Sequence, residues 1–359
     1  MDLTDEQKHF VGPPIVAGAN AARAFDAPVR YPLLFTRWGS PELSTALRLS
    51  SFSSFLVMIE HIIGVLVIAP FMFFFRGFGH LREVTATFER RDWVAALMVS
   101  LGSGLGLYFF LIALAMGNPT VAILLQKSQP LITLFVAMLV LKERPKKRFY
   151  MALAVALLGI FLLSFNDIKN AELFGLTAVV CSLIAAGFWG SNTVFGRLLT
   201  DKVDYWDLTF FRYIGGAGVL IVFNLLIFAF TPDNINALTE TFTTFPNVFG
   251  GFEMTGLMII IYAAILTGGI LPLALYYYGL RWSKASVGGL AELAFPLLAV
   301  FVNWITLGYF LTDVQILGTI ILLLAVTALT YINAKEYEEE KAGKSIESVD
   351  DAMQVLEET

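Results

Sequence analysis

The sequence predicts an all-α membrane protein of ten transmembrane helices, arranged as two inverted five-helix repeats. Three observations lead to this prediction: long apolar segments, little charge, and a repeated order of residues in the two halves. Of the 359 residues, 57% are hydrophobic and 15% are charged, whereas soluble domains carry about 25% charged residues. The charges lie in short segments between apolar runs of the length, about 20 residues, that crosses a bilayer.

Nine apolar segments are long enough to cross a membrane as helices, the conformation that satisfies backbone polar groups in lipid. They are expected at 51–75, 92–116, 118–141, 147–166, 173–196, 206–230, 254–280, 285–309 and 314–334. A weaker segment at 8–24 contains Gly12, Pro13, Pro14 and Asn20. It is either a further span or a peripheral N-terminal arm, and we count it as span 1 because each half then has five helices.

Basic residues in the loops predict the orientation, since cytoplasmic loops carry more Lys and Arg. With both termini in the cytoplasm, sixteen basic residues fall on the cytoplasmic side and five outside. We therefore expect a multi-pass protein of the plasma (inner) membrane. Residues 335–359 hold nine acidic and three basic residues and are expected to form an acidic, disordered cytoplasmic tail. The rest of the chain is close to neutral, which argues against nucleic-acid binding.

The outer loop at 231–253 has no Lys or Arg and carries four phenylalanines at helical spacing. They are Phe242, Phe245, Phe249 and Phe252. This spacing fits an amphipathic helix at the membrane interface, and a simple hydrophobic plug fits equally well.

A shift of 166 residues aligns the two halves of the chain. It superimposes Leu124–Leu131 on Leu290–Leu297, so that Pro130 coincides with Pro296 and Gln126 with Glu292. We therefore divide the chain into repeats at 1–166 and 167–334. Repeats with an odd number of spans lie in the membrane with opposite orientations, an arrangement common in secondary transporters.

Three motifs follow one another at fixed spacing. They are the run Pro130–Leu141 with Glu143 and Gly159, the tetrapeptide Trp189-Gly190-Ser191-Asn192, and the Pro296 run with Gly318, in which Tyr309 replaces the terminal Glu. In this order they resemble the drug/metabolite transporter (DMT) superfamily, specifically its EamA-type ten-helix members, over residues of about 90 to 334. The resemblance implies transport of metabolites or drugs through a central cavity lined chiefly by spans 1, 3, 4, 6, 8 and 9.

Ionisable groups within the spans cost about 2.5–3.5 kcal/mol each, so they are candidates for function. Lys127 and Glu292 are the strongest, because they lie just before Pro130 and Pro296. Proline lacks an N–H, which leaves a free carbonyl four residues earlier and favours a helix kink. We expect Lys127 to hold an anionic group, and Glu292 to hold a cationic group or a coupling proton. An internal Lys127–Glu292 salt bridge is the alternative.

Other polar and aromatic residues are expected around the same substrate site. They are Gln126, Gln129, Tyr108, Trp189, Asn192 and Tyr276. Glu60 and His61 are further candidates for the coupling ion, or for polar contacts between helices. Arg212 lies six residues into its span, and we expect its side chain to extend to the cytoplasmic headgroups.

The sequence contains none of the short motifs of a protease, hydrolase or ATP-driven enzyme. With one cysteine and three scattered histidines, neither a metal nor a cofactor is expected. We expect a secondary transporter, an exporter working by alternating access as a monomer or homodimer. Small zwitterions such as amino acids suit a Lys and a Glu in one cavity. The alternatives are a flippase for lipid-linked or amphiphilic cargo and a proton-coupled exporter of cationic drugs.

Overall fold

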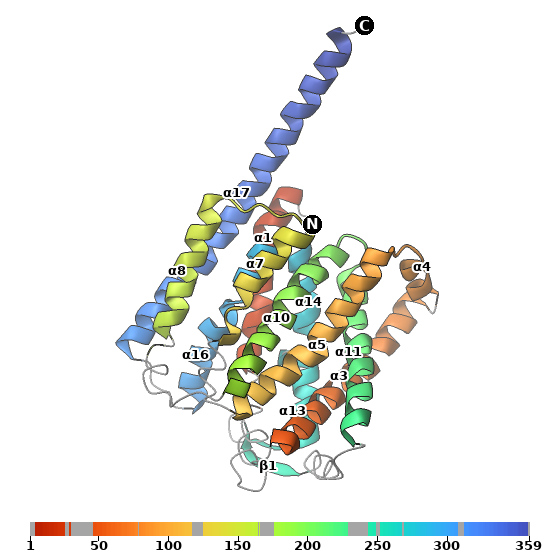
Figure 1. Cartoon of the computed structure of the whole chain (residues 1–359), viewed down its shortest axis with the longest axis vertical. Coiled ribbons are helices and arrows are strands. Elements are labelled where there is room, and N and C mark those ends of the chain that lie inside the picture. Colours follow the sequence, from red (N-terminus) through yellow and green to blue (C-terminus); the bar gives the residue numbers. More distant parts are fainter. Residues whose placement is uncertain are drawn as a thin grey trace.

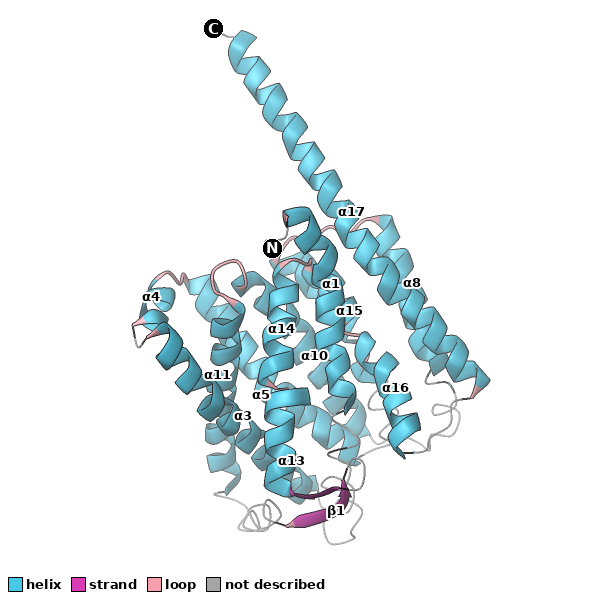
Figure 2. Cartoon of the chain, turned by 180° about the vertical axis from the view of Figure 1, so that it is seen from behind, coloured by secondary structure: helices cyan, strands magenta, loops and turns pink. Residues whose placement is uncertain are grey.

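A computed structural model describes residues 4–25, 29, 46–77, 79–116, 125–163, 165, 176–228, 243–248, 252–267, 269–307 and 312–357. These residues form a bundle of helices with one two-stranded sheet at one end (Figures 1 and 2). Six of the described helical segments are long and apolar enough to cross a membrane. They are Ser54–Arg76, Arg90–Ala113, Leu176–Leu199, Tyr205–Leu226, Gly256–Arg281 and Asp313–Glu339.

The helices follow one another along the chain with few regular elements of any other kind. They are α1 Asp5–Ala21, the 3-10 helix η1 Ala22–Phe25, α3 Ala46–Arg76, α4 His80–Ala86, α5 Arg90–Met116, α7 Gln129–Val140, α8 Lys147–Leu163, α10 Leu176–Leu199, α11 Tyr205–Phe228, α13 Gly256–Tyr262, the π-helix η4 Ala263–Thr267, α14 Ile270–Arg281, α15 Ala285–Ala291, α16 Ala294–Leu307 and α17 Asp313–Glu357.

The weakest predicted segment forms helix α1 and packs inside the bundle. A capping box begins it: Thr4 N donates to Gln7 Oε1 at 2.9 Å, and Gln7 N donates to Thr4 Oγ1 at 3.3 Å. Val16 is fully buried. Gly12 faces Gly279 of α14 so closely that a Cβ on Gly279 would lie 2.8 Å from the Gly12 carbonyl oxygen. The alternative of a peripheral N-terminal arm is therefore wrong.

Two helical segments are interrupted just before a proline. Residues 125–126 are helical, a turn follows, and α7 begins at Gln129 with Pro130 as its second residue. Likewise α15 ends at Ala291, a turn follows, and α16 begins at Ala294 with Pro296 as its third residue. Proline fits the first turn of a helix, where its missing N–H needs no partner. Both interruptions therefore fall where a new helix starts.

Two glycines from the sequence motifs bring α8 and α17 into backbone contact. A Cβ on Gly318 would lie 2.5 Å from Leu163 N and 2.8 Å from the carbonyl oxygen of Gly159. Around this crossing, residues of α7, α8, α15 and α17 form a hydrophobic core. A second core joins α1, α3, α5, α10, α11 and α14, and four of these helices, α1, α10, α11 and α14, border the cavity described below.

A hairpin replaces part of the amphipathic helix predicted between 231 and 253. Strands β1 Thr244–Val248 and β2 Phe252–Thr255 pair antiparallel, with Thr244 opposite Thr255. Phe245 lies in β1 and Phe252 in β2, so for these residues the helix prediction is wrong. Pro246 within β1 disfavours a helix interior, while Thr, Phe and Val favour strands. Phe242 and Phe249 lie outside the described residues.

The C-terminal helix continues far past the last predicted span. Helix α17 has 45 residues and rises well beyond the bundle (Figure 1). The prediction of a disordered tail from residue 335 onward is therefore wrong as far as Glu357. Residues 335–342 are mainly Glu, Lys and Ala, which favour helix. The prediction considered their charge and not their helix propensity.

Ion pairs join two of the predicted cytoplasmic loops at one end of the bundle. Arg76, at the end of α3, contacts Asp204 and lies 3.4 Å from Asp207 in the region before and at the start of α11. The Lys202 ammonium donates to Asp92 of α5 at 2.6 Å, and this hydrogen bond raises the pKa of Lys202. These loops therefore share a side, as the predicted orientation requires. Which side of the membrane it is stays a prediction.

Candidate functional site

A polar cavity lies between α1, η1, α10, α11, α14 and the turn after α15. It encloses about 30 Å³, well below the roughly 300–1,000 Å³ typical of small-molecule sites, so in this conformation a solute enters only if the surrounding helices move apart. Its walls are formed by Ala19, Asn20, Arg23, Trp189, Asn192, Thr193, Arg212, Pro272, Leu273, Tyr276 and Glu292. Two arginines and one carboxylate thus share one cavity among apolar helices.

The Glu292 carboxylate is held by three neutral hydrogen-bond donors from three different helices. Thr193 of α10 donates to Oε1 at 2.7 Å, and the Tyr276 hydroxyl of α14 lies 2.9 Å from the same oxygen. Gln129 of α7 donates from Nε2 to Oε2 at 2.5 Å. Among the described residues, no cationic group lies within 4 Å of this carboxylate. Glu292 is therefore fixed by amide and hydroxyl groups, at the point where α15 ends.

The alternative to substrate contact, an internal Lys127–Glu292 salt bridge, is not formed in this conformation. Lys127 is 7% exposed, and its Nζ lies 4.4 Å from the centre of the Phe295 ring, a cation–π contact. Lys127 is not among the described residues that line the cavity. The positive charge on the cavity wall comes instead from Arg23 and Arg212, which the sequence analysis did not assign to the site.

Arg212 is buried, so the expectation that it extends to the headgroups is wrong. Its Nε donates to Ser103 Oγ at 3.1 Å, and its Nη1 donates to Tyr277 Oη at 3.3 Å. Arg212 lies seven residues after the first residue of α11, which is roughly 10 Å along the helix axis. At that depth the side chain turns into the cavity wall and not toward the loops.

A histidine supports Arg212 from the neighbouring helix α3. His61 Nδ1 lies 2.8 Å from the Val57 carbonyl oxygen, and Nε2 lies 2.8 Å from Ser103 Oγ. A carbonyl only accepts, so a neutral His61 carries its hydrogen on Nδ1 and accepts at Nε2 from Ser103. Ser103 in turn accepts from Arg212. Gly216 makes room for the ring, because a Cβ there would lie 2.6 Å from His61 Cδ2.

The tetrapeptide Trp189–Asn192 lies on the cavity wall because glycines allow the helices to approach closely. A Cβ on Gly190 would lie 3.0 Å from the Gln129 carbonyl oxygen. On α5, a Cβ on Gly106 would lie 2.6 Å from Trp189 Nε1, and one on Gly102 would lie 2.9 Å from Asn192 Cβ. The motif thus joins α10 to α5 and α7 and presents Trp189 and Asn192 to the cavity.

The structure brings six of the predicted site residues together and places Lys127, Tyr108 and Glu60 elsewhere. Trp189, Asn192, Tyr276 and Glu292 line the cavity, while Gln129 binds Glu292 and Gln126 binds Gln129 at 2.8 Å. Tyr108 packs instead against Phe109 and Phe223, with ring centres 5.1 and 4.8 Å away. Glu60 is buried on α3 but is not among the described lining residues. His61 reaches the cavity only through Ser103 and Arg212.

Four polar residues on the wall were not predicted as site residues: Asn20, Arg23, Thr193 and Arg212. Asn20 had a signal in the sequence, since Ala17-Gly18-Ala19-Asn20 resembles Trp189-Gly190-Ser191-Asn192 at a looser shift of 172 residues. Arg23 was counted among the five basic residues on the outer side, and it belongs to the helical turn η1 that follows α1.

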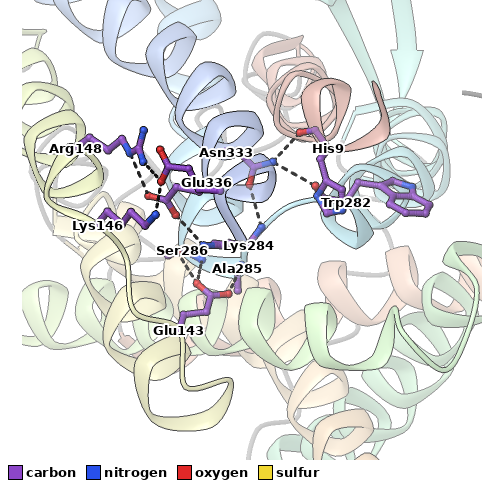
Figure 3. A network of polar contacts seen from close by, with 11 residues as sticks. His9, Glu143, Lys146, Arg148, Trp282, Lys284, Ala285, Ser286, Asn333 and Glu336 are labelled. Carbon is purple, nitrogen blue, oxygen red and sulfur yellow. Dashed lines mark hydrogen bonds and ion pairs between the residues drawn. The ribbon is translucent and has the colours of Figure 1, made fainter. Parts of the chain in front are cut away.

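A separate network of hydrogen bonds and ion pairs joins several segments at the end of the bundle where both termini lie (Figure 3). Glu143 accepts from Ala285 N at 2.7 Å, from Ser286 N at 3.1 Å and from Ser286 Oγ at 2.5 Å. It therefore caps the first turn of α15, where backbone N–H groups lack partners within the helix. Lys284, just before α15, pairs with Glu336 of α17 at 2.8 Å.

The same network reaches the N-terminal helix and the start of α8. Asn333 donates from Nδ2 to the His9 carbonyl oxygen at 2.7 Å, and the His9 ring stacks on Tyr337 with ring centres 3.7 Å apart. Arg148 pairs with Glu339, as does Lys146. The network thus joins α1, the segment before α8, the start of α15 and α17 (Figure 3).

Membrane-length helices around a polar cavity, with a helix broken at a charged wall residue, define an α-helical membrane protein of the transport class. A model of the EamA-like transporter family matches residues 38–165 and again 176–331. The chain therefore belongs to the EamA-like transporter family and is an integral membrane protein, as the resemblance to the DMT superfamily implied.

Two relatives carry the word transporter in their names. The riboflavin transporter ImpX of Fusobacterium nucleatum is 28% identical over 312 residues, which are 84% of this chain and 96% of the relative. The uncharacterized transporter YoaV of Bacillus subtilis is 24% identical over 181 residues, 50% of this chain and 56% of the relative. A solved crystal structure superposes on 90% of this chain and 98% of its own, with a TM-score of 0.59 and 14% identity. That likeness concerns the fold alone.

Proposed function

We propose that the chain is a secondary transporter that moves a small organic solute past Glu292 by alternating access. The observation that carries this proposal is a carboxylate at a helix break, on the wall of a polar cavity. Polar groups and irregular backbone are tolerated at membrane depth where they line a wet cavity. Family membership supports a small solute as the cargo, and so do the two relatives named as transporters.

Two inverted five-helix repeats, at 1–166 and 167–334, would supply the moving parts. Three observations support this division. The family model matches the chain twice, α7 and α16 both begin just before a proline, and Gln129 meets Glu292 between them. The repeats would rock about this meeting point, and the residues 335–357 would form a helical extension in the cytoplasm.

The network of Figure 3 would act as the gate on the cytoplasmic side. It joins segments of both proposed repeats: Glu143 lies in the first, while Ser286, Lys284 and Glu336 lie in or follow the second. Opening that side requires breaking the bonds to Glu143. The solute would then reach the cavity from the cytoplasm, as export through a plasma membrane with cytoplasmic termini requires.

Transport by purified protein in liposomes tests the proposal. Riboflavin and a set of amino acids would be followed into and out of the vesicles, with and without a pH gradient. Riboflavin is included because of the named relative, and amino acids because Glu292 and Arg212 offer both charges. We expect saturable movement of at least one solute, and at least a tenfold loss in Glu292→Gln.

The control is Glu89→Gln, which alters a carboxylate whose side chain is 79% exposed. It should transport as the wild type does. If a pH gradient drives wild-type transport but not Glu292→Gln, the coupling proton is assigned to Glu292. Full activity of folded Glu292→Gln would reject the site, and no solute movement by wild-type protein in either direction would reject the function.

A further inference from the structure

We propose that the cavity recognises a planar heterocycle through a ring N–H next to a carbonyl group. The N–H would donate to Asn192 Oδ1 and the carbonyl would accept from Arg212, while Trp189 would stack on the ring. This inference rests on the proposed transport function and assigns a substrate class to the same cavity.

Asn192 supplies the acceptor. It lines the cavity and is 3% exposed, and among the described residues its Oδ1 has no hydrogen-bond donor. Buried polar atoms are nearly always hydrogen-bonded, so an orphan acceptor on a cavity wall needs an explanation. The atom itself has less than 1 Å² of exposed surface in this conformation, so a donor on the transported solute would satisfy it once the helices around the cavity move apart. The side chain cannot withdraw, because α5 approaches at Gly102, where a Cβ would touch Asn192.

Arg212 supplies donors with a defined orientation. Two of its five N–H hydrogens bind Ser103 and Tyr277, and the Ser103–His61 contact holds that arrangement. The remaining N–H groups belong to a guanidinium that lines the cavity. No carboxylate lies within 4 Å of it among the residues that the structure describes. A carbonyl or acidic oxygen of the solute would be its partner.

The rest of the cavity wall offers apolar surface for a flat ring. Trp189 lines the cavity, and its ring centre lies 5.2 Å from that of Phe110, which supports it from α5. Pro272 and Leu273 add apolar surface on the side of α14. Aromatic faces and apolar side chains with a few convergent polar groups are typical of small-molecule sites.

An amino acid fits the same wall less well. Its ammonium would need the Glu292 carboxylate, which already accepts from Gln129, Thr193 and Tyr276. A carboxylate offers about four lone-pair sites, so little of its capacity is left. The groups with unused capacity are the Asn192 acceptor and the Arg212 donors, which match an N–H beside a C=O.

Riboflavin and N3-methylriboflavin form a matched pair of probes. Riboflavin has a ring N–H between two carbonyls, and the second compound replaces only that hydrogen with a methyl group. Binding to the purified full-length protein would be measured by quenching of flavin fluorescence. We expect the wild type to bind riboflavin about tenfold or more tightly than the methylated compound, because a buried acceptor left unpaired is costly.

The variants then locate the contact. Asn192→Ala should bind both flavins about equally, since the discriminating acceptor is gone. Arg212→Gln should weaken riboflavin about tenfold or more while keeping the preference for it over the methylated compound. The control is Ser182→Ala, which removes a buried hydroxyl without a partner from the same helix α10, at a position that does not line the cavity. It should keep wild-type affinity and discrimination.

Equal binding of the two flavins by wild-type protein would overturn the inference, and so would discrimination that survives in Asn192→Ala. Transport of amino acids without any flavin binding would reject the substrate class and leave the transport function intact. If wild-type protein moves none of these solutes, the proposed function itself fails. A melting temperature within a few degrees of the wild type shows that each variant is folded.

Discussion

Gln129 donates its Nε2 hydrogen to Glu292 Oε2 at 2.5 Å, across the two helix interruptions. Its Oε1 accepts from Gln126 Nε2 at 2.8 Å. Gln126 and Glu292 occupy equivalent positions in the repeated sequence, so one amide joins two corresponding residues of the proposed halves. This amide therefore marks the point about which the proposed halves would move.

Replacing Gln129 should therefore destabilise the protein. Gln129→Leu keeps the size of the side chain but removes a donor to a half-buried carboxylate, which should cost about 1–3 kcal/mol. Thermal unfolding of the purified protein in detergent measures the loss. Gln126→Leu is the matched comparison, because it breaks a bond between neutral groups worth about 0.5–1.5 kcal/mol. Equal melting temperatures for the two variants would contradict the idea that Gln129 supports a charged Glu292.

Glu143→Ala should lower the stability of the end that holds the polar network. Glu143 accepts three hydrogen bonds at the start of α15, and losing such a cap costs about 0.5–2 kcal/mol. Its pairing with Ser286 also joins the two proposed repeats, so proteolysis or solvent labelling of this end should increase. Glu83→Ala alters an exposed acidic residue of α4 and should leave both measurements unchanged. No difference between these variants would exclude a capping role for Glu143.

Gly318→Ala should be strongly destabilising, whereas Gly218→Ala should be tolerated. A methyl group on Gly318 would lie 2.5–2.9 Å from backbone atoms of α8, which cannot move aside as a side chain does. At Gly218 no atom lies within 4 Å of the added carbon, and alanine favours helix by roughly 1 kcal/mol. Comparing the two melting temperatures tests whether α8 and α17 pack as closely as described. A stable Gly318→Ala variant would show that they do not.

Helices were predictable because lipid imposes apolar segments of nearly fixed length, and Pro130 and Pro296 act through local backbone chemistry. The hairpin at Thr244–Thr255 was missed because regular spacing of phenylalanines is compatible with several structures. For Lys127, the sequence predicts a costly buried charge but not its neighbour, which is Phe295 of α16, far along the chain.

Arg212 was misplaced for a similar reason. Its distance from the start of the segment is a property of the sequence, but its contacts with Ser103 and Tyr277 depend on how α5 and α14 pack against α11. The role of Asn192 as an orphan acceptor also depends on packing. Whether a buried polar group has a partner is decided by the packing of distant segments and not by its local sequence.

Ser103→Ala should impair transport although Ser103 is not a proposed contact of the solute, because Ser103 positions Arg212. Its hydroxyl accepts from Arg212 Nε at 3.1 Å and donates to His61 Nε2, 2.8 Å away. Without it, two buried groups lose a partner at a cost of about 1–3 kcal/mol, and the guanidinium is free to turn. We expect a KM raised several-fold with a smaller change in kcat, since the orientation of a binding group is lost.

Ser100→Ala is the control for this prediction. It makes the same change one turn earlier on α5, where the hydroxyl donates to the Ala96 carbonyl oxygen of its own helix at 2.8 Å. It should leave KM unchanged. Initial rates of solute uptake into liposomes, measured over a range of concentrations, separate the two variants. If both raise KM equally, the effect comes from the packing of α5 against α11 and not from the positioning of Arg212.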